Sequence, residues 1–149
     1  MSMDVHHLAG RPVIIGGGIA GLMTALHLAP EPVLLLSRTP FGADASSAWA
    51  QGGLAASLGD DDDPALHLAD TLAAGGGLCD REMARRILNA APDAIETLAG
   101  FGARFDRTPA GAGRLGLAAA HSRLRHLHAH GDGGGREVPS APVPALASA

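Results

Sequence analysis

Two short apolar runs near the start of the chain are separated by a stretch with helical periodicity. The first run, residues 12–15, stops at three consecutive glycines, as a buried strand does when it enters a turn. From Ile19 to Ala29, apolar residues recur at helical spacing until Pro30 forbids continuation. Residues 33–37 form a second apolar run, typical of a parallel strand covered on both faces. The pattern predicts a strand–helix–strand (βαβ) unit over residues 12–37.

Helix signals return in the middle of the chain. Asp60–Asp63 precede Pro64, and acidic residues before a proline in the first turn indicate the start of a helix. A calcium site is the alternative, but the run lacks the alternating ligands and the glycine of a calcium-binding loop. We expect a helix over residues 64–74. We expect a second over 81–90, capped by Asp80, and a third that Pro92 opens and that ends near Gly100.

The last third of the chain shows no clear periodicity. From Phe101 onward glycines interrupt the pattern, so we expect irregular structure and no strand. Residues 139–149 carry three prolines among Val, Ala, Ser and Leu, a composition that indicates a disordered tail. The predicted organisation is one domain over residues 11–138 followed by the tail at 139–149.

Composition and charge exclude several classes of protein. The chain has 149 residues and a formal charge of −4, from 11 Lys and Arg against 15 Asp and Glu, which argues against a general nucleic-acid binder. The apolar runs are far shorter than the ~20 residues of a membrane-spanning helix. The start has no signal-peptide pattern, and Cys79 is the only cysteine. We therefore expect a protein of the reducing cytoplasm, with no membrane contact.

The sequence Gly16-x-Gly18-x-x-Gly21 falls between the first predicted strand and the first predicted helix. In that context Gly16 permits a tight turn, Gly18 lets the backbone approach a pyrophosphate, and Gly21 allows close packing of helix and strand. The diphosphate would rest on the N–H groups of the helix start. A glycine-rich turn without a ligand is the bland alternative. This unit alone fits FAD, NAD or NADP equally.

The next segment resembles a known family. Residues 41–53, rich in Ser, Ala and Gly, are similar to the flavin-contacting loop of the superfamily containing succinate dehydrogenase, fumarate reductase and L-aspartate oxidase. The motifs most similar to L-aspartate oxidases are Ser37-Arg38, Ser46-Ser47, residues 50–53, 70–75, 78–80, Phe105-Asp106, 121–123 and 131–137. The resemblance implies an α/β fold with a Rossmann-like FAD-binding βαβ domain, here incomplete, with a helical insertion.

The resemblance also implies which residues hold FAD. Residues 17–20 would hold the diphosphate, Arg38 the adenosine end, and residues 46–53 the isoalloxazine. The respiratory dehydrogenases bond FAD to a histidine of this loop; Ser46 stands where that histidine would align, so we expect non-covalent FAD. The residues expected to contact the cofactor are Gly16, Gly17, Gly18, Ile19, Ala20, Gly21, Arg38, Ser46, Ser47, Ala48, Trp49, Ala50, Gln51, Gly52 and Gly53.

By resemblance, the activity is oxidation of L-aspartate to iminoaspartate for NAD biosynthesis through quinolinate, with quinolinate synthase as a pathway partner. The family's substrate-covering domain and its catalytic arginines have no counterpart in these 149 residues, so we expect the chain alone to be a truncated, inactive form. Residues 116–120 also lack the acid that the family carries before its His-Ser pair. The alternatives are a fumarate reductase or succinate dehydrogenase-like fragment and a non-catalytic nucleotide-binding fragment.

Three isolated features have plainer explanations. His121, His126, His128 and His130 could bind zinc or nickel if they shared a strand face, but no strand is indicated there, and we expect solvated surface or family contacts instead. Cys79 is expected to be a small packing residue. Trp49 either stacks on the flavin or merely packs beside it.

Overall fold

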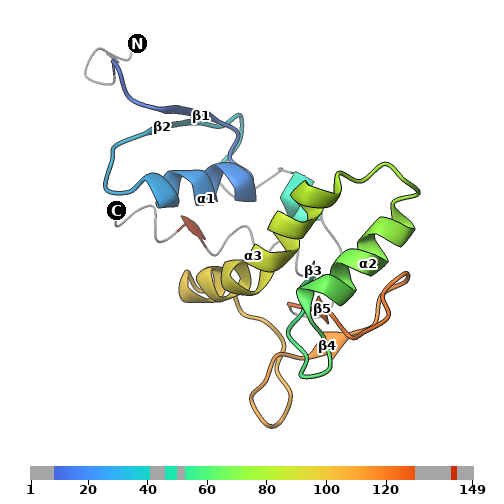
Figure 1. The fold of residues 1–149 in the computed structure, drawn as a ribbon. Coiled ribbons are helices and arrows are strands. Elements are labelled where there is room, and N and C mark those ends of the chain that lie inside the picture. Colours follow the sequence, from blue (N-terminus) through green and yellow to red (C-terminus); the bar gives the residue numbers. More distant parts are fainter. Residues whose placement is uncertain (1–8, 41–45, 50–52, 130–141, 144–149) are drawn as a thin grey trace.

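The computed structural model describes residues 9–40, 46–49, 53–129 and 142–143, and all structural statements refer to these (Figure 1). The described residues form both helices and strands. In order they are β1 (Val13–Ile15), α1 (Ile19–Leu28), β2 (Leu34–Leu36), the 3₁₀ helix η2 (Ser46–Trp49), β3 (Leu54–Ala55), α2 (Pro64–Ala74), α3 (Arg81–Gly100), β4 (Leu115–Gly116) and β5 (His126–Leu127). None of the helices in the described residues has the length and apolar character that crossing a membrane requires.

The predicted βαβ unit is confirmed. β1 and β2 pair in parallel, with Val13 opposite Leu34 and Ile15 opposite Leu36, and α1 lies against one face of the pair (Figure 1). Leu22 and Ala25 are the buried residues of α1. The expectations that β1 is buried and that β2 is covered on both faces are wrong for the described residues, because Ile15 is 84% and Leu36 is 44% exposed. One layer of helix covers only one side of a two-stranded sheet.

The two central helices begin where their capping residues predict. Asp63 Oδ1 accepts the N–H groups of Ala65 and Leu66 at 2.7 and 2.8 Å, and Asp80 accepts the N–H of Met83 at 2.8 Å. The expected break at Pro92 is wrong, since α3 runs through it as one helix. Its buried residues Leu88, Ile95 and Leu98 lie along one face on both sides of Pro92. Burial of that continuous face outweighs the cost of the missing proline N–H.

A second sheet occupies the region that we expected to be irregular. β3, β5 and β4 form a three-stranded antiparallel sheet with β5 in the centre, where Leu127 pairs with both Leu54 and Leu115. Each of these strands has only two residues, so no alternation of apolar and polar positions could indicate them. The expectation of no strand around residue 126 is therefore wrong.

The core lies between α3 and this antiparallel sheet. Two clusters of buried residues, Leu98 with Ala103 and Ala129, and Ala56 with Ile95 and Leu127, share the neighbours Leu54 and Phe105. Ile19 and Met23 of α1 pack against the first cluster. The start of α1 is thereby fixed against α3.

The predicted disordered tail lies mostly outside the described residues. Only Pro142 and Val143 are described there, and both have helical conformation, with Pro142 buried. The expectation of a disordered tail over residues 139–149 stays a prediction.

Candidate functional site

The glycine turn between β1 and α1 is tightly closed. Gly16 has a φ of +117°, a region that side chains disfavour, and its N–H donates to the Leu36 carbonyl at 2.8 Å. A Cβ on Gly21 would lie 2.0 Å from the Gly16 carbonyl oxygen. The backbones of the helix and the turn are therefore in direct contact, and this geometry requires glycine at both positions.

The start of α1 presents a helix N-terminus to the turn. Gly18 is the N-cap residue, with extended backbone and no side-chain cap. The first N–H groups of a helix have no partner within the helix, and its dipole is positive at this end. Gly17 precedes this N-cap, and Ala20 lies in the first turn of α1. This arrangement can bind an anion such as a diphosphate.

Ser47 joins the second predicted part of the site to the first. Its Oγ accepts the N–H of Ile19 at 3.4 Å, across 28 residues of sequence. The structure thus places η2, which contains Ser46, Ser47, Ala48 and Trp49, beside the helix start. A ligand bound at this helix start could therefore extend along η2.

Arg38 follows β2 at the same edge of the sheet as the glycine turn. The parallel register places Ile15 beside Leu36, so the residues after each strand emerge together. Arg38 is exposed, and the preceding Ser37 donates its hydroxyl to the Thr39 carbonyl at 2.7 Å. This position suits contact with the adenosine end of a nucleotide.

The remaining predicted contacts fall in the loop around η2. Trp49 is 71% exposed, so it is not a core residue, whereas Gly53 lies against β5. A Cβ on Gly53, which has a φ of +145°, would be 2.2 Å from the Leu127 carbonyl oxygen. Close packing against β5 therefore requires glycine at position 53, independently of any cofactor. The predicted contacts Ala50, Gln51 and Gly52 lie outside the described residues.

An ion-pair cluster around Arg125 escaped the sequence analysis. Asp62 accepts two hydrogen bonds from Arg125, at 2.6 Å from Nε and 2.7 Å from Nη2, and Asp70 Oδ2 accepts a third, at 2.5 Å from Nη1. Arg125 and Asp62 have fully buried side chains. The hydrogen bonds from Arg125 hold the pKa of Asp62 below its usual value. Both acids precede Arg125 by more than fifty residues, so no local pattern could reveal the cluster.

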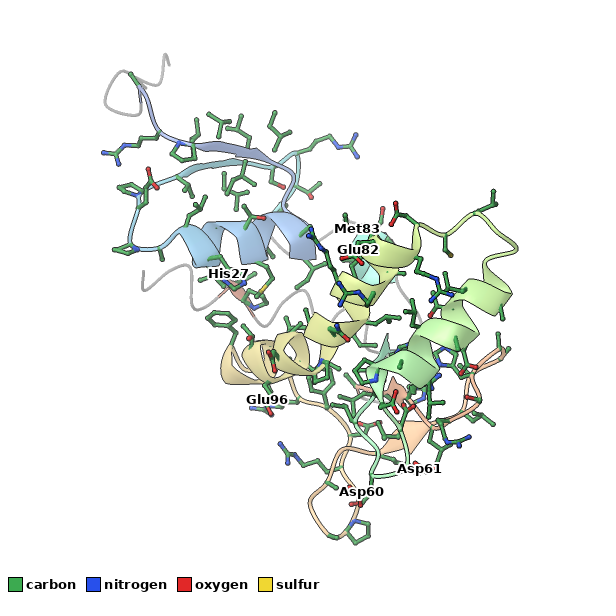
Figure 2. The ribbon with its side chains drawn as sticks, viewed as in Figure 1. His27, Asp60, Asp61, Glu82, Met83 and Glu96 are labelled. Atoms are coloured by element: carbon green, nitrogen blue, oxygen red, sulfur yellow. The ribbon has the colours of Figure 1, made fainter. Side chains whose placement is uncertain are left out.

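The acidic run before α2 therefore has separate roles. Asp63 caps the helix, Asp62 reaches Arg125, and Asp61 lies 3.4 Å from Arg123 Nε. Asp60 and Asp61 lie on the loop that leads into α2 (Figure 2). At the start of the next helix, α3, Glu82 forms an ion pair with Arg85 at 2.7 Å. The prediction of a helix start is confirmed for Asp63.

The histidines of the chain's last third are not simply solvated surface. His121, His126 and His128 are all partly buried, and the rings of His126 and His128 lie 4.9 Å apart. Burial, and then His128 and His121, lower the pKa of His126. Within the described ranges no three His, Cys, Asp or Glu side chains gather as a metal site, and His130 lies outside those ranges.

His67 is the buried histidine of this region. Its ring lies 5.2 Å from that of His121, and its Nδ1 is 3.5 Å from Ser57 Oγ. Burial, followed by the positive charge of Arg125, lowers the pKa of His67. His67 is therefore neutral near neutral pH.

Comparison with known proteins identifies curated relatives. The chain is 67% identical over 138 residues to the L-aspartate oxidase of Mesorhizobium japonicum, a match that covers 93% of this chain and 27% of the relative. It is 59% identical to the L-aspartate oxidase of Agrobacterium fabrum, covering 85% of this chain and 24% of the relative. The resemblance inferred from sequence motifs is thus confirmed. The chain spans about a quarter of the length of these relatives, at their N-terminal part.

Solved structures agree on the fold. A Mycobacterium smegmatis Sdh1 complex superposes with a TM-score of 0.82 at 31% identity, covering 89% of this chain and 23% of that one. A quinol-fumarate reductase superposes with a TM-score of 0.85 at 24% identity, covering 93% and 24%. The fold is therefore the mixed helix-and-strand FAD-binding fold of these flavoproteins.

A family model also matches the chain. The model describes an FAD binding domain and aligns with residues 11–146, which include the turn, η2 and both sheets. FAD is the cofactor that this family and the L-aspartate oxidase relatives indicate. Because the match extends over far more than half of its 149 residues, this chain belongs to the family of FAD binding domains.

Proposed function

We propose that these residues bind FAD non-covalently and form the N-terminal, nucleotide-binding part of an L-aspartate oxidase. The observation that carries the proposal is the contact of Ser47 with the start of α1, because it joins the glycine turn to the predicted flavin loop. The identity of 67% to an L-aspartate oxidase supports the choice of enzyme. The activity would be oxidation of L-aspartate to iminoaspartate in NAD biosynthesis, in the cytoplasm, with quinolinate synthase as a pathway partner.

The chain's own residues divide the cofactor between them. The N–H groups of residues 16–21 would bind the diphosphate at the positive end of α1, in a Rossmann-like arrangement. Arg38 would contact the adenosine end and residues 46–53 the isoalloxazine. Bound FAD supplies a hydride acceptor to the reaction. Ser46 is an exposed residue of η2, and its hydroxyl is not the imidazole through which the respiratory dehydrogenases attach FAD.

We propose further that the 149 residues do not oxidise L-aspartate by themselves. They correspond to about a quarter of the matched relatives. Much of an enzyme's acceleration comes from positioning the substrate and stabilising charge in the transition state. Those contributions would need groups outside the matched quarter. A fumarate reductase-like activity is less well supported, since the likeness to quinol-fumarate reductase is 24% in sequence and concerns the fold.

Substitution at the glycine turn tests the cofactor site. Gly18→Val places a branched side chain at the N-cap of α1, and we expect FAD affinity to fall at least about tenfold, measured by flavin fluorescence titration. The matched control is Gly100→Val, where an added Cβ meets nothing within 4 Å, and we expect its affinity to equal that of the parent. Acid precipitation of the flavin-loaded parent should release all flavin into the supernatant.

Two results would contradict the proposal. A folded Gly18→Val chain that binds FAD as tightly as the parent removes the diphosphate from the glycine turn. Flavin fluorescence that stays on the precipitated polypeptide shows a covalent link. Neither result depends on turnover of L-aspartate.

A further inference from the structure

Two histidines share one face of the antiparallel sheet. Side chains alternate along a strand, so His126 and His128 lie on the face opposite to Leu127, which is buried in the core. The residues that pair with His126 on the neighbouring strands are small, namely Ala55 on β3 and Gly116 on β4. The two imidazoles are therefore flanked by strand residues that leave space around the rings.

The two rings meet above β4. A Cβ on Gly116 would lie 2.9 Å from His128 Nε2, so the His128 ring extends over the residue that pairs with His126. The centroids of the two rings are 4.9 Å apart, and the angle between the ring planes is 72°. Zinc binds imidazole nitrogens at about 2.0–2.1 Å in tetrahedral geometry, which places the centroids of two bound rings roughly 5 Å apart. The pair thus has the spacing that a shared metal ion requires.

The nitrogens of both rings are available to a ligand. Neither ring forms a hydrogen bond with a described residue, and neither has a nitrogen among the buried atoms that lack a partner. These nitrogens therefore reach solvent. Burial, and then His128 and His121, lower the pKa of His126, so its ring is neutral near neutral pH and keeps a lone pair. Neutral imidazole is the form that binds metal ions.

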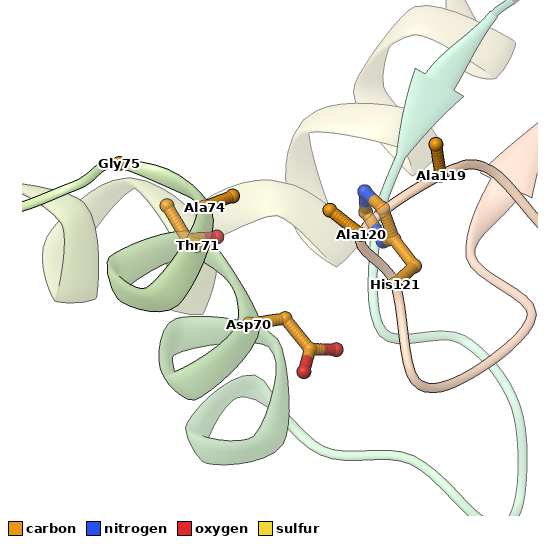
Figure 3. A pocket seen from close by; sticks show the side chains of 7 residues that line it. All are labelled: Asp70, Thr71, Ala74, Gly75, Ala119, Ala120 and His121. Atoms are coloured by element: carbon orange, nitrogen blue, oxygen red, sulfur yellow. The ribbon is translucent and has the colours of Figure 1, made fainter.

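His121, which precedes the pair in the chain, has a different environment. It lines a cavity of about 360 Å³, opposite Asp70 and Ala74 of α2 (Figure 3). Its ring lies 5.2 Å from that of the buried His67, and its Nδ1 is itself buried. A buried nitrogen cannot bind an ion at the surface of the sheet, so His121 is not counted as a ligand.

The arginines that precede the pair do not oppose a cation. Arg125 pairs with Asp62 and Asp70, and Arg123 Nε lies 3.4 Å from a carboxylate oxygen of Asp61. Alternation along the strand also places Arg125 on the face opposite to the two histidines. The positive charges nearest in sequence are thus offset by carboxylates without the help of an ion.

We propose that His126 and His128 bind one divalent transition-metal ion of the class that imidazole prefers, such as Zn²⁺ or Ni²⁺. The protein supplies two ligands, because no group of three His, Cys, Asp or Glu side chains gathers in the part of the chain that the structure describes. Water fills the remaining coordination positions. The site uses neither the glycine turn nor η2, so it does not depend on the proposed FAD site.

Titration of the full 149-residue chain with Zn²⁺ tests this proposal, and Mg²⁺ is the control ion because it prefers oxygen ligands. Imidazole and backbone NMR signals of residues 126–128 are followed, which separates this site from the adjacent His6 and His7. We expect saturable shifts with Zn²⁺ and none with Mg²⁺. Equal responses to the two ions, or no saturable response to Zn²⁺ at these residues, would show that no metal site exists here.

Three histidine variants provide the matched comparison. His126→Gln and His128→Gln each remove one ligand, whereas His27→Gln removes an exposed histidine of α1. We expect either ligand variant to weaken Zn²⁺ binding at β5 by at least about tenfold, because the second imidazole acts at a high effective concentration once the first is bound. His27→Gln should leave the affinity unchanged. If one ligand variant does not give a dispersed spectrum, the other tests the site, and parental affinity in either folded variant would overturn the proposal.

Discussion

The βαβ unit, residues 13–36, and the region from Gly53 to Ala129 differ in the kinds of side chain that they leave exposed and that they bury. In the βαβ unit, the strand residues Val13 and Ile15 are 56% and 84% exposed. In the second region, the side chain of Arg125 is wholly buried and pairs with two carboxylates of the same region. Apolar strand residues lie outside in one part and a guanidinium lies inside in the other.

The difference shows where each part derives its order. The βαβ unit is held by local geometry: a parallel pair of three-residue strands, one helix and a turn of glycines. The second region is held by contacts between distant segments, with Arg125 joining the loop before α2, α2 itself and β5. We therefore expect substitutions in the two parts to have separate effects, which amide hydrogen exchange can resolve.

The largest effect should come from Arg125→Met. Removing the guanidinium leaves Asp62 buried without its partner, and breaking a buried pair in this way costs about 3–5 kcal/mol. We expect the free energy of unfolding, measured by urea denaturation, to fall by that amount, with loss of exchange protection throughout residues 53–129.

Arg123→Met is the matched control for this substitution. Its partner Asp61 is 79% exposed, and exposed pairs contribute only about 0–1 kcal/mol. Equal destabilisation by the two variants would mean that the Arg125 cluster does not hold the second region together.

A smaller effect is expected from Gly21→Ala in the βαβ unit. The new Cβ would lie 2.0 Å from the Gly16 carbonyl oxygen, and overpacking of this kind costs about 1–3 kcal/mol. Exchange should rise in residues 13–36 while residues 53–129 stay protected. Gly100→Ala, where the Cβ is unopposed, should be neutral or slightly stabilising. Uniform loss of protection along the chain would show that the two parts unfold as one.

The smallest effect is a dependence of stability on pH that resides in the second region. Burial lowers the pKa of His67 below 6.5 in the folded chain, so the unfolded chain binds more protons than the folded chain as the pH falls below that value. Stability is then complete above pH 6.5 and is lost as the pH falls towards the lowered pKa. Asp62, whose pKa lies below 3.8, has the same sign, and its contribution is lost as the pH falls below that value.

Urea denaturation at several pH values, with His67→Gln alongside, measures this dependence. The variant should lose less stability than the parent between pH 7 and pH 5, while the decline below pH 4 remains. The pKa of His126 is also lowered, so the variant should still lose some stability as the pH falls over this range. If the free energy of unfolding depended on pH in the same way in parent and variant, His67 would be excluded as a source of the pH dependence.

Local signals explain how much of the fold could be predicted. The βαβ unit, the start of α2 and the cap of α3 each depend on neighbouring residues, such as Asp63 next to Pro64. The continuity of α3 through Pro92 depends on burial along a face that only the folded chain presents. The antiparallel sheet depends on pairing of Leu127 with residues 54 and 115, which no spacing rule records.

The candidate site divides in the same way. The glycine pattern could be interpreted from strand, spacing and helix, and the structure supplies its tight backbone contact at Gly21. The contact between Ile19 and Ser47 spans 28 residues, so the sequence could suggest it only by resemblance to a family. The ion-pair cluster around Arg125 joins segments more than fifty residues apart and was not foreseen.

The buried Arg125 also orders events during synthesis. The βαβ unit is fully translated at residue 36, but Asp62 and Asp70 cannot pair with Arg125 until residue 125 is also translated. At roughly 5–20 residues per second, about ninety residues separate the two moments by ~5–20 s. During that interval the nascent chain carries Asp62 and Asp70 without the arginine that pairs with both of them in the folded chain. We expect the first part to form co-translationally and the second to wait for its arginine.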